Sequence, residues 1–339
     1  MADAYGAGRP GRGKVLVVGM DGLRFDRLPL PRPPDDGSRV PSRSPSTAPV
    51  LHGLMAAGAH GSSLLPYGEV DGGAEGGPST SMAYTDSGPG WSSVLTGVWP
   101  DRHGVTGNDF EGADYARHPD FLSRAAAARP GLRTVAAVSW PELVDRGTLG
   151  PAIGERVRYD GESDGYEDAD RRVADTARRR IAEDDPDALF VYFGATDEAG
   201  HATGPLSPAY DRALLAQDAH LGRLLDAIAV RCSDPARADE RWTVVVTTDH
   251  GHLDIGGHGG DTRAEREVFV VLAEPGASGG RAAPGPHVGT RLDTPRLVDI
   301  APTVLDRLGI PVDPTWGLPG RVLPRPVPSL PSPPTSERS

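Results

Sequence analysis

The chain has 339 residues, of which 37% are hydrophobic and 24% are charged, so it can supply both an apolar core and a hydrated surface. Its formal net charge of −12 argues against binding of nucleic-acid polymers, because contacts to a phosphate backbone need clustered Lys and Arg. The single cysteine, Cys232, excludes an internal disulfide and any site built from several cysteines, so a metal would need Asp, Glu and His.

The chain shows no segment that would place it in or across a membrane. No apolar run approaches the roughly 20 residues that cross a bilayer, and residues 1–13 lack the apolar centre of a secretory signal. We therefore expect a cytoplasmic protein with no membrane partner. One catalytic domain is expected over residues 14–323, with a flexible N-terminus at 1–13 and a disordered tail at 324–339.

Short β-branched runs alternate with helical patterns along the chain, which is typical of a sheet covered by helices. The expected strands, in chain order, are residues 14–18, 133–138, 188–193, 242–247 and 268–272. The expected helices are residues 50–57, 92–97, 210–228 and 295–308. Residues 30–46 and 68–81 are rich in Pro, Gly, Ser and Asp and are expected to form long loops. The pattern predicts an α/β fold with a mostly parallel central sheet and helices on both faces.

Three acidic residues lie just beyond the ends of expected strands: Asp21, Asp197 and Asp249. In open parallel sheets the carboxyl ends of the strands form the ligand crevice, so separate segments can deliver carboxylates to one place. Each of them alone could equally cap the turn or helix that follows its strand.

Histidines accompany two of these carboxylates. His201 follows Asp197 by four residues, His250 follows Asp249 directly, and His258 comes later in a Gly-Gly-His-Gly-Gly turn. Asp and neutral His are suitable ligands for first-row metals. The repeated pairing of Asp with His predicts two metal sites, with zinc as the leading candidate.

A possible nucleophile lies in the segment Thr-Asp-Ser87-Gly-Pro-Gly-Trp, ahead of the expected helix at 92–97. Backbone N–H groups and the positive end of the dipole at a helix N-terminus favour an anion or an alkoxide there. The alternative interpretation is an ordinary serine N-cap, which is a common use of Ser at such a position.

Together these segments resemble the alkaline phosphatase superfamily, and most closely its nucleotide pyrophosphatase/phosphodiesterase branch. The resemblance covers residues 14 to 323 and implies an alkaline phosphatase-like fold. It is carried, in chain order, by Val-Gly-Met-Asp21-Gly-Leu-Arg, Thr-Asp-Ser87-Gly-Pro, Leu-Thr-Gly-Val-Trp-Pro-Asp-Arg-His103-Gly-Val-Thr-Gly-Asn108, Thr-Asp197-Glu-Ala-Gly-His201 and Thr-Thr-Asp249-His250-Gly.

The resemblance also implies roles for single residues around two divalent ions, with Zn²⁺ as the first choice and Mn²⁺ as the second. One ion would be held by Asp21, Ser87, Asp249 and His250, and the other by Asp197, His201 and a third histidine. The turn around His258 resembles the Gly-His-Gly element of ethanolamine-phosphate transferases in the same superfamily, so His258 is the expected third histidine and His287 is the alternative.

The resemblance further implies a reaction. Ser87 would attack phosphorus, Asn108 would support the phosphate oxygens with the backbone N–H of the nucleophile, and water would then cleave the phosphoseryl intermediate. The expected substrate is a small phosphorylated molecule with a phosphodiester or pyrophosphate bond. The branch usually has Thr followed by an aromatic residue that helps to hold a nucleobase, whereas here Gly88 follows Ser87. Tyr192 lies where the branch can place an aromatic base contact, but a Tyr in a buried strand fits the core equally well.

Other activities of the superfamily remain as alternatives: a phosphomonoesterase, a phosphonate hydrolase or a sulfatase. The nucleophile segment has no Arg or Lys to bind a dianionic monoester, which favours diesters. A sulfatase would carry Cys or Ser in Cys/Ser-x-Pro-x-Arg, and Trp91 stands here in place of that Arg. A non-catalytic metal-binding relative would lack the nucleophile or a ligand, and the sequence shows no such loss. The substrate and the oligomeric state stay open.

Overall fold

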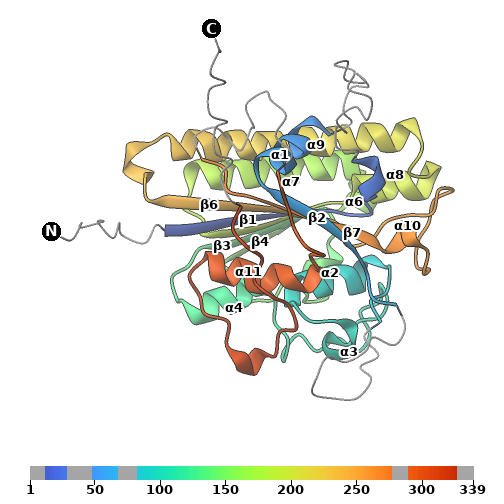
Figure 1. The fold of residues 1–339 in the computed structure, drawn as a ribbon, viewed down its shortest axis with the longest axis horizontal. Helices are drawn as coiled ribbons and strands as arrows, with labels where there is room; N and C mark the ends of the chain where they lie inside the picture. The colour runs from blue at the N-terminus through green and yellow to red at the C-terminus, as the bar shows by residue number, and fades with distance from the viewer. Residues whose placement is uncertain (1–11, 29–47, 68–81, 277–288, 327–339) are drawn as a thin grey trace, which may run out of the picture.

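The computed structural model describes residues 12–28, 48–67, 82–276 and 289–326. Both expected loops, at 30–46 and 68–81, lie outside these residues, as does His287. So does most of each predicted terminal segment, of which only residues 12–13 and 324–326 are described. The described part of the chain forms an eight-stranded sheet in the order β4-β3-β5-β1-β6-β7-β2-β8. Helices cover both of its faces, and Figure 1 shows them as layers above and below the strands.

The centre of the sheet is parallel, and one of its edges is mixed. The strands are β1 (Arg12–Met20), β2 (Ala59–Leu64), β3 (Thr134–Val138), β4 (Glu155–Arg158), β5 (Ala188–Phe193), β6 (Glu240–Thr247), β7 (Glu267–Ala273) and β8 (Thr290–Arg291). Strand β7 runs antiparallel to both β6 and β2, and the other pairings are parallel. The predicted α/β fold with a mostly parallel sheet is therefore confirmed.

Three strands were missed by the sequence prediction. Strand β2 (Ala-His-Gly-Ser-Ser-Leu) is too polar to match a buried run, β4 (Glu-Arg-Val-Arg) is mostly charged and has no buried residue, and β8 has only two residues. The predicted start of β1 at residue 14 was also wrong, because Arg12 and Gly13 already pair with β6. The expected flexible N-terminus thus cannot include those two residues.

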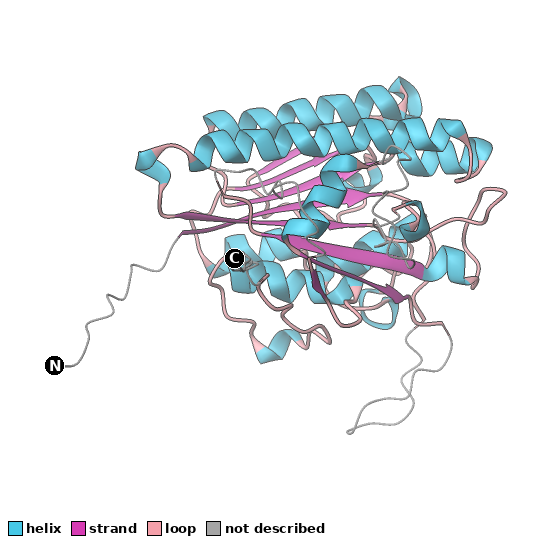
Figure 2. Ribbon diagram, turned by 45° about the horizontal axis from the view of Figure 1, so that its top comes forward, coloured by secondary structure: helices cyan, strands magenta, loops and turns pink. Residues whose placement is uncertain are grey.

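The helices divide between two cores, one on each face of the sheet. Leu16 and Val18 of β1 point to the core beneath α1 (Pro49–Ala57), α7 (Tyr166–Glu183) and α9 (Pro208–Cys232). Val15 and Val17 point to the core beneath α2 (Ser87–Thr96), α4 (Phe121–Ala128) and α11 (Ile300–Arg307). This alternation follows from the two-residue period of a strand. Figure 2 shows α7 and α9 as two long helices side by side on one face.

Shorter helices connect these layers. They are α3 (Pro100–His103), α5 (Glu142–Asp145), α6 (Gly161–Asp164), α8 (Ala195–Thr203), α10 (Arg263–Arg266), and the 3₁₀ turns η1 (Phe25–Arg27), η2 (Pro235–Arg237), η3 (Leu297–Asp299) and η4 (Pro314–Trp316). The helix expected at 295–308 is split into η3 and α11. No helix in the described ranges is both long and apolar enough to cross a bilayer.

Helix α2 begins earlier than predicted. The sequence placed its start at residue 92, after Pro89 and Gly90, whereas the structure starts the helix at Ser87. Proline is tolerated in a first helical turn, where backbone N–H groups have no intrahelical partner, so Pro89 does not stop this helix.

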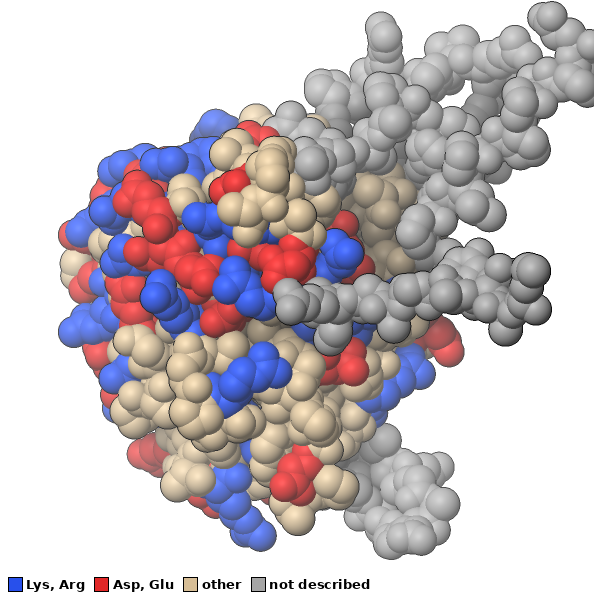
Figure 3. All heavy atoms as spheres, turned by 90° about the vertical axis from the view of Figure 1, so that its left-hand side faces the viewer, with Lys and Arg blue, Asp and Glu red and all other residues tan. Residues whose placement is uncertain are grey.

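The amino-terminal ends of the strands carry a network of ion pairs. Arg231 pairs with Glu240 and Asp185, and Lys14, the only lysine of the chain, pairs with Asp185 and with Asp187. Figure 3 shows acidic and basic side chains intermingled on this end of the molecule. Lys14 therefore has a structural role at the amino-terminal ends of the strands. The three strand-end carboxylates lie at the carboxyl-terminal ends.

Candidate active site

The three strand-end carboxylates meet at one edge of the sheet. Asp21 directly follows β1, Asp249 follows β6, and Asp197 lies in the first turn of α8, just after β5. Because these strands are parallel neighbours, their carboxyl ends lie side by side. Asp21 and Asp249 are fully buried, and 18% of the Asp197 side chain is exposed.

Ser87 faces this group of carboxylates from the N-terminus of α2. Its Oγ lies 3.2 Å from Nε2 of His250 and 3.4 Å from Oδ1 of Asp21. Ser87 is the first residue of the helix, and the N-cap position is taken by Asp86. The interpretation of Ser87 as an ordinary N-cap is therefore wrong.

The glycine after Ser87 has a structural reason. A Cβ on Gly88 would stand 2.6 Å from the carbonyl oxygen of Gly107, a distance that real Cβ atoms do not reach. The N–H of Gly88 donates a hydrogen bond of 2.7 Å to Oδ1 of Asn108. The backbone around Asn108 thus approaches α2 too closely for an aromatic residue at position 88. In the nucleotide pyrophosphatase/phosphodiesterase branch, an aromatic residue usually follows the nucleophile.

One group of potential metal donors consists of Asp21, Asp249 and His250, whose ligand atoms all lie within 4.8 Å of one another. Nδ1 of His250 lies 3.0 Å from the carbonyl oxygen of Gly251, which places the proton on Nδ1 and leaves Nε2 as a lone-pair donor. Oδ2 of Asp249 is buried and has no hydrogen-bond partner. A cation would satisfy both atoms, so these residues fit a metal ion.

A second group consists of Asp197, His201 and His258, within the same 4.8 Å limit. The Nε2 atoms of the two histidines lie 3.0 Å apart, and Nε2 of His201 lies 3.3 Å from Oδ2 of Asp197. Nδ1 of His258 lies 2.7 Å from the carbonyl oxygen of Thr85, which directs Nε2 into the group. The structure thus brings His258 to the place where the sequence predicted a third histidine.

The crowding of carboxylates shapes the electrostatics of the site. Burial, together with the charge of Asp197, raises the pKa of Asp21 to about 7. Burial and the charge of Asp21 also raise the pKa of Asp249 well above its ordinary value. In the described ranges, no Lys or Arg pairs with any of the three carboxylates. Divalent cations would remove this repulsion, because they favour the ionised carboxylates.

The pKa values of Asp197 and His258 shift in the direction that favours the charged form of each side chain. Burial opposes ionisation of Asp197, but its contacts with His201 and His252 hold the pKa of Asp197 well below its usual range. Burial likewise opposes the imidazolium of His258, but the contact with Asp86 and the charge of Asp197 raise the pKa of His258 to about 9. Without a metal, this shift favours the protonated form of His258.

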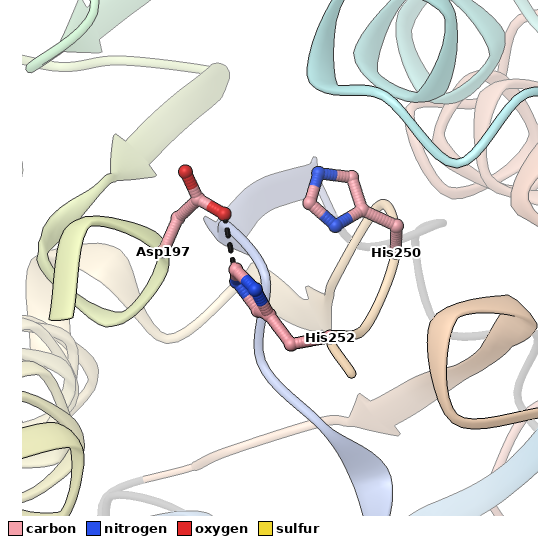
Figure 4. A group of neighbouring side chains, drawn as sticks. All are labelled: Asp197, His250 and His252. Carbon is pink, nitrogen blue, oxygen red and sulfur yellow. Dashed lines mark ion pairs between the residues drawn. The ribbon is translucent and has the colours of Figure 1, made fainter. Parts of the chain in front are cut away.

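Sequence reasoning missed three residues that contact the carboxylates. His252 is fully buried, and its Nε2 lies 2.8 Å from Oδ1 of Asp197; Figure 4 shows the two side chains beside His250. Trp91 donates from Nε1 to Oδ2 of Asp21 at 2.9 Å, and the Tyr192 hydroxyl donates to the same oxygen. Only His252 had a local signal, because it follows Asp249-His250 by a single glycine. Tyr192 is 3% exposed and belongs to the core, so it is not a base contact.

Comparison with known proteins identifies the family. Residues 15–263 match the family described as type I phosphodiesterase / nucleotide pyrophosphatase. The chain belongs to this family. The matched range includes Ser87, Asn108 and both predicted groups of metal donors. The resemblance to the alkaline phosphatase superfamily is thereby confirmed, and superfamily membership supports a metal-dependent site.

Curated members of related protein families are similar to part of this chain. A 2,3-bisphosphoglycerate-independent phosphoglycerate mutase of Halobacterium salinarum is 36% identical over 140 residues, which are 41% of this chain and 24% of the mutase. Ectonucleotide pyrophosphatase/phosphodiesterase family member 7 of Homo sapiens is 30% identical over 108 residues, which are 31% of this chain and 22% of that protein. The chain thus aligns with about a quarter of the length of these relatives.

Several solved structures share the fold of this chain, although their sequence identity to it is low. Murine ectonucleotide pyrophosphatase / phosphodiesterase 5 is 16% identical with a TM-score of 0.56, over 89% of this chain and 96% of that one. A phosphonate monoester hydrolase of Agrobacterium radiobacter is 16% identical with a TM-score of 0.56, over 91% and 78%. A 2-O GAG sulfatase is 15% identical with a TM-score of 0.58, over 92% and 73%. These likenesses establish a common fold.

Proposed function

We propose that this protein hydrolyses phosphate esters at a two-metal centre, with Ser87 as the nucleophile and with phosphodiester or pyrophosphate bonds of small molecules as its substrates. One observation carries the proposal: the Ser87 hydroxyl lies at the N-terminus of α2, 3.2 Å from His250 and 3.4 Å from Asp21. Asp21 and His250 belong to one of three groups of potential metal donors in the described residues, and the predicted second group, Asp197, His201 and His258, is another. Membership of the type I phosphodiesterase / nucleotide pyrophosphatase family supports the same chemistry.

The donor sets divide the proposed centre between two ions. Asp21, Asp249 and His250, together with Ser87, would hold one ion, and Asp197, His201 and His258 would hold the other. The mixture of imidazole and carboxylate donors suits Zn²⁺ best, with Mn²⁺ as the alternative. When bound, such ions lower the pKa of an adjacent hydroxyl and offset the negative charge of a phosphoryl group.

The residues of the chain then divide the work of the reaction. Oγ of Ser87 forms a bond to phosphorus as the bond from phosphorus to the leaving oxygen breaks, which yields a phosphoseryl intermediate. The Ser87 hydroxyl gives up its proton to solvent in this step, and the leaving oxygen takes a proton from solvent as it departs. The positive end of the α2 dipole favours the serine alkoxide. Oδ1 of Asn108 accepts from Gly88, so its Nδ2 group is the end that can donate to a phosphoryl oxygen. Water then attacks phosphorus, the bond from phosphorus to Oγ of Ser87 breaks, Oγ takes a proton back, and the phosphate product leaves.

The charges around Ser87 favour a monoanionic diester over a dianionic monoester. A second negative charge on the phosphoryl group usually needs an additional cation such as Arg. Arg24 is the basic residue closest in sequence to Asp21 within the described ranges. Its side chain is paired with Asp26 and Asp254. The nucleophile segment itself has no basic residue.

The test is hydrolysis of nitrophenyl esters by protein loaded with Zn²⁺ or with Mn²⁺, using a phosphate monoester, a phosphate diester, a phosphonate and a sulfate. We expect the diester to be cleaved fastest and Ser87→Ala to abolish cleavage. Ser93→Ala is the matched control, because Ser93 is also buried on α2 but bonds to Pro89 and His103. Cleavage of the sulfate ester alone, or full activity of Ser87→Ala, would overturn the proposal.

A further inference from the structure

His252 occupies a space that two glycines keep open. A Cβ on Gly22 would lie 2.5 Å from Nε2 of His252, and a Cβ on Gly200 would lie 2.6 Å from the same atom. Both distances are shorter than real Cβ contacts. Any larger residue at position 22 or 200 would therefore push the imidazole out of its place. The ring is fully buried between the loop after β1 and helix α8.

The backbone and the ring of His252 are fixed from several sides. Its carbonyl oxygen accepts from Nη1 of Arg24 at 3.2 Å. The N–H groups of the residues before and after it donate to Glu265 and to Gly257 at 2.7 and 2.9 Å. The edge of the ring faces Tyr210 at a centroid distance of 6.5 Å. The imidazole is thus held in one orientation without any contribution from a metal.

The two nitrogens of this ring are not equivalent. Nε2 lies 2.8 Å from Oδ1 of Asp197, whereas Nδ1 is buried without any hydrogen-bond partner. A buried N–H without an acceptor is more costly than a bare lone pair, so the proton belongs on Nε2. The Nε2–H then faces Asp197, although the two groups are not aligned as a full hydrogen bond.

The hydrogen-bond partners of the ring nitrogens distinguish His252 from His250 and His258, two of the predicted metal donors. A histidine that binds a metal usually donates its other N–H to a carbonyl or carboxylate. His250 has such a partner in the carbonyl of Gly251, and His258 has one in the carbonyl of Thr85. His252 has none. The ligand atoms of His252, Asp197 and His250 also lie within 4.8 Å of one another, so distance alone would allow His252 to bind a metal. The tautomer favours the role of a donor to Asp197, because Nδ1 has no acceptor for a proton.

We propose that His252 is a positioning residue: its Nε2–H holds Oδ1 of Asp197, so that Oδ2 is directed toward His201. Gly22 and Gly200 are small because the imidazole must fit between them. This inference rests on the metal centre of the proposed function, but it assigns a role to residues outside that centre.

The experiment measures Zn²⁺ affinity of the full chain by competition with a chromogenic chelator, together with thermal unfolding of the metal-free protein. His252→Ala should weaken one of the two Zn²⁺ sites about 10- to 100-fold, the usual effect of losing a residue that orients a metal ligand. His252→Gln should restore most of the affinity, because its amide can donate to Oδ1 of Asp197. A glutamine cannot replace an imidazole that binds metal directly.

Gly200→Ala provides an independent test, since alanine favours the helix in which Gly200 lies and should not unfold the protein. The added methyl should displace the His252 ring and weaken the same site by about the same 10- to 100-fold factor. In the His252→Ala background, Gly200→Ala should have no further effect, because the clash is gone. Gly53→Ala is the matched control, as Gly53 is also helical and a Cβ there meets nothing within 4 Å.

His201→Ala serves as the reference for removal of a direct ligand. Loss of one full equivalent of Zn²⁺ in both His252→Ala and His252→Gln, as in His201→Ala, would make His252 a ligand and overturn the inference. Unchanged affinity in His252→Ala and Gly200→Ala would also overturn it, while the metal centre would stand. Full metal content in His201→Ala would instead overturn the proposed centre itself.

Discussion

The Tyr192 hydroxyl donates a hydrogen bond to Oδ2 of Asp21, while Oδ1 of the same carboxylate lies 3.4 Å from the Ser87 hydroxyl. Trp91 donates to Oδ2 as well, at 2.9 Å. One oxygen of Asp21 is thus occupied by two donors from the core, and the other is directed at the nucleophile. This arrangement fixes the carboxylate before any ion binds.

Tyr192→Phe should therefore weaken metal binding without unfolding the protein. The Phe ring can keep the packing of Tyr192 against Trp91, at a centroid distance of 5.3 Å. Loss of the donor should lower Zn²⁺ affinity about 10- to 100-fold, which a chelator competition would measure. Tyr115→Phe is the control, because its hydroxyl contacts Ser92 and Thr148 instead of the carboxylates. Equal affinities for the two variants would show that Tyr192 only fills the core.

The carboxylates of the two donor groups should be indispensable for metal. Asp197→Ala and Asp249→Ala should each remove bound metal and nearly all activity, because each deletes an anionic ligand of one proposed site. Elemental analysis of the purified variants measures this directly. Asp170→Ala is a useful comparison, since Asp170 is also buried but bonds only to scaffold groups, including the N–H groups at the start of α8. Full metal content and normal turnover in both Asp197→Ala and Asp249→Ala would refute the two-metal centre.

Ser87 and Asn108 should differ in the size of their effects. Ser87→Ala should stay folded and keep at least one metal, but its rate should fall by several orders of magnitude, as is usual when a covalent nucleophile is removed. Asn108→Ala should lose roughly 10²- to 10³-fold, the range for one lost oxyanion donor. Steady-state kinetics on the best ester substrate gives both numbers. A larger defect in Asn108→Ala than in Ser87→Ala would contradict the assigned roles.

The metal-free protein should lose stability as the pH rises. The contact with Asp86 and the charge of Asp197 outweigh burial and raise the pKa of His258 from 6.5 to about 9. The folded protein then holds a proton that the unfolded chain releases, so this stabilisation is complete below pH 6.5 and is lost as the pH rises through 9. The full change in the free energy of unfolding is roughly 3 kcal/mol. Denaturant titrations in a chelator across this interval would measure it.

Metal binding should show the reverse dependence on pH. An ion at His258 must displace the proton, so affinity should rise about tenfold per pH unit until the pKa of His258 is passed. His258→Gln should lose both the pH-dependent stability and this part of the pH-dependent affinity. A flat stability profile for the metal-free wild-type protein would show that His258 is already neutral.

The positions of the three strand-end carboxylates could be predicted from the sequence alone. Buried apolar runs ahead of Asp21, Asp197 and Asp249 placed these carboxylates correctly, because parallel strands end at a common edge. The bounds predicted for β5, residues 188–193, agree with the structure. Such features depend on patterns within a few residues, which a single chain displays directly.

The contacts of Tyr192, Trp91 and His252 with those carboxylates could not be predicted from the sequence. The hydrogen bond from Tyr192 to Asp21 spans 171 residues, and the approach of Gly22 to His252 joins the ends of two different strands. Strand β7 likewise runs antiparallel to both of its neighbours, β6 and β2, and β2 is a polar segment that the sequence did not mark as a strand. Contacts of this kind depend on the packing of segments that are distant in the sequence, so no local pattern of residues predicts them.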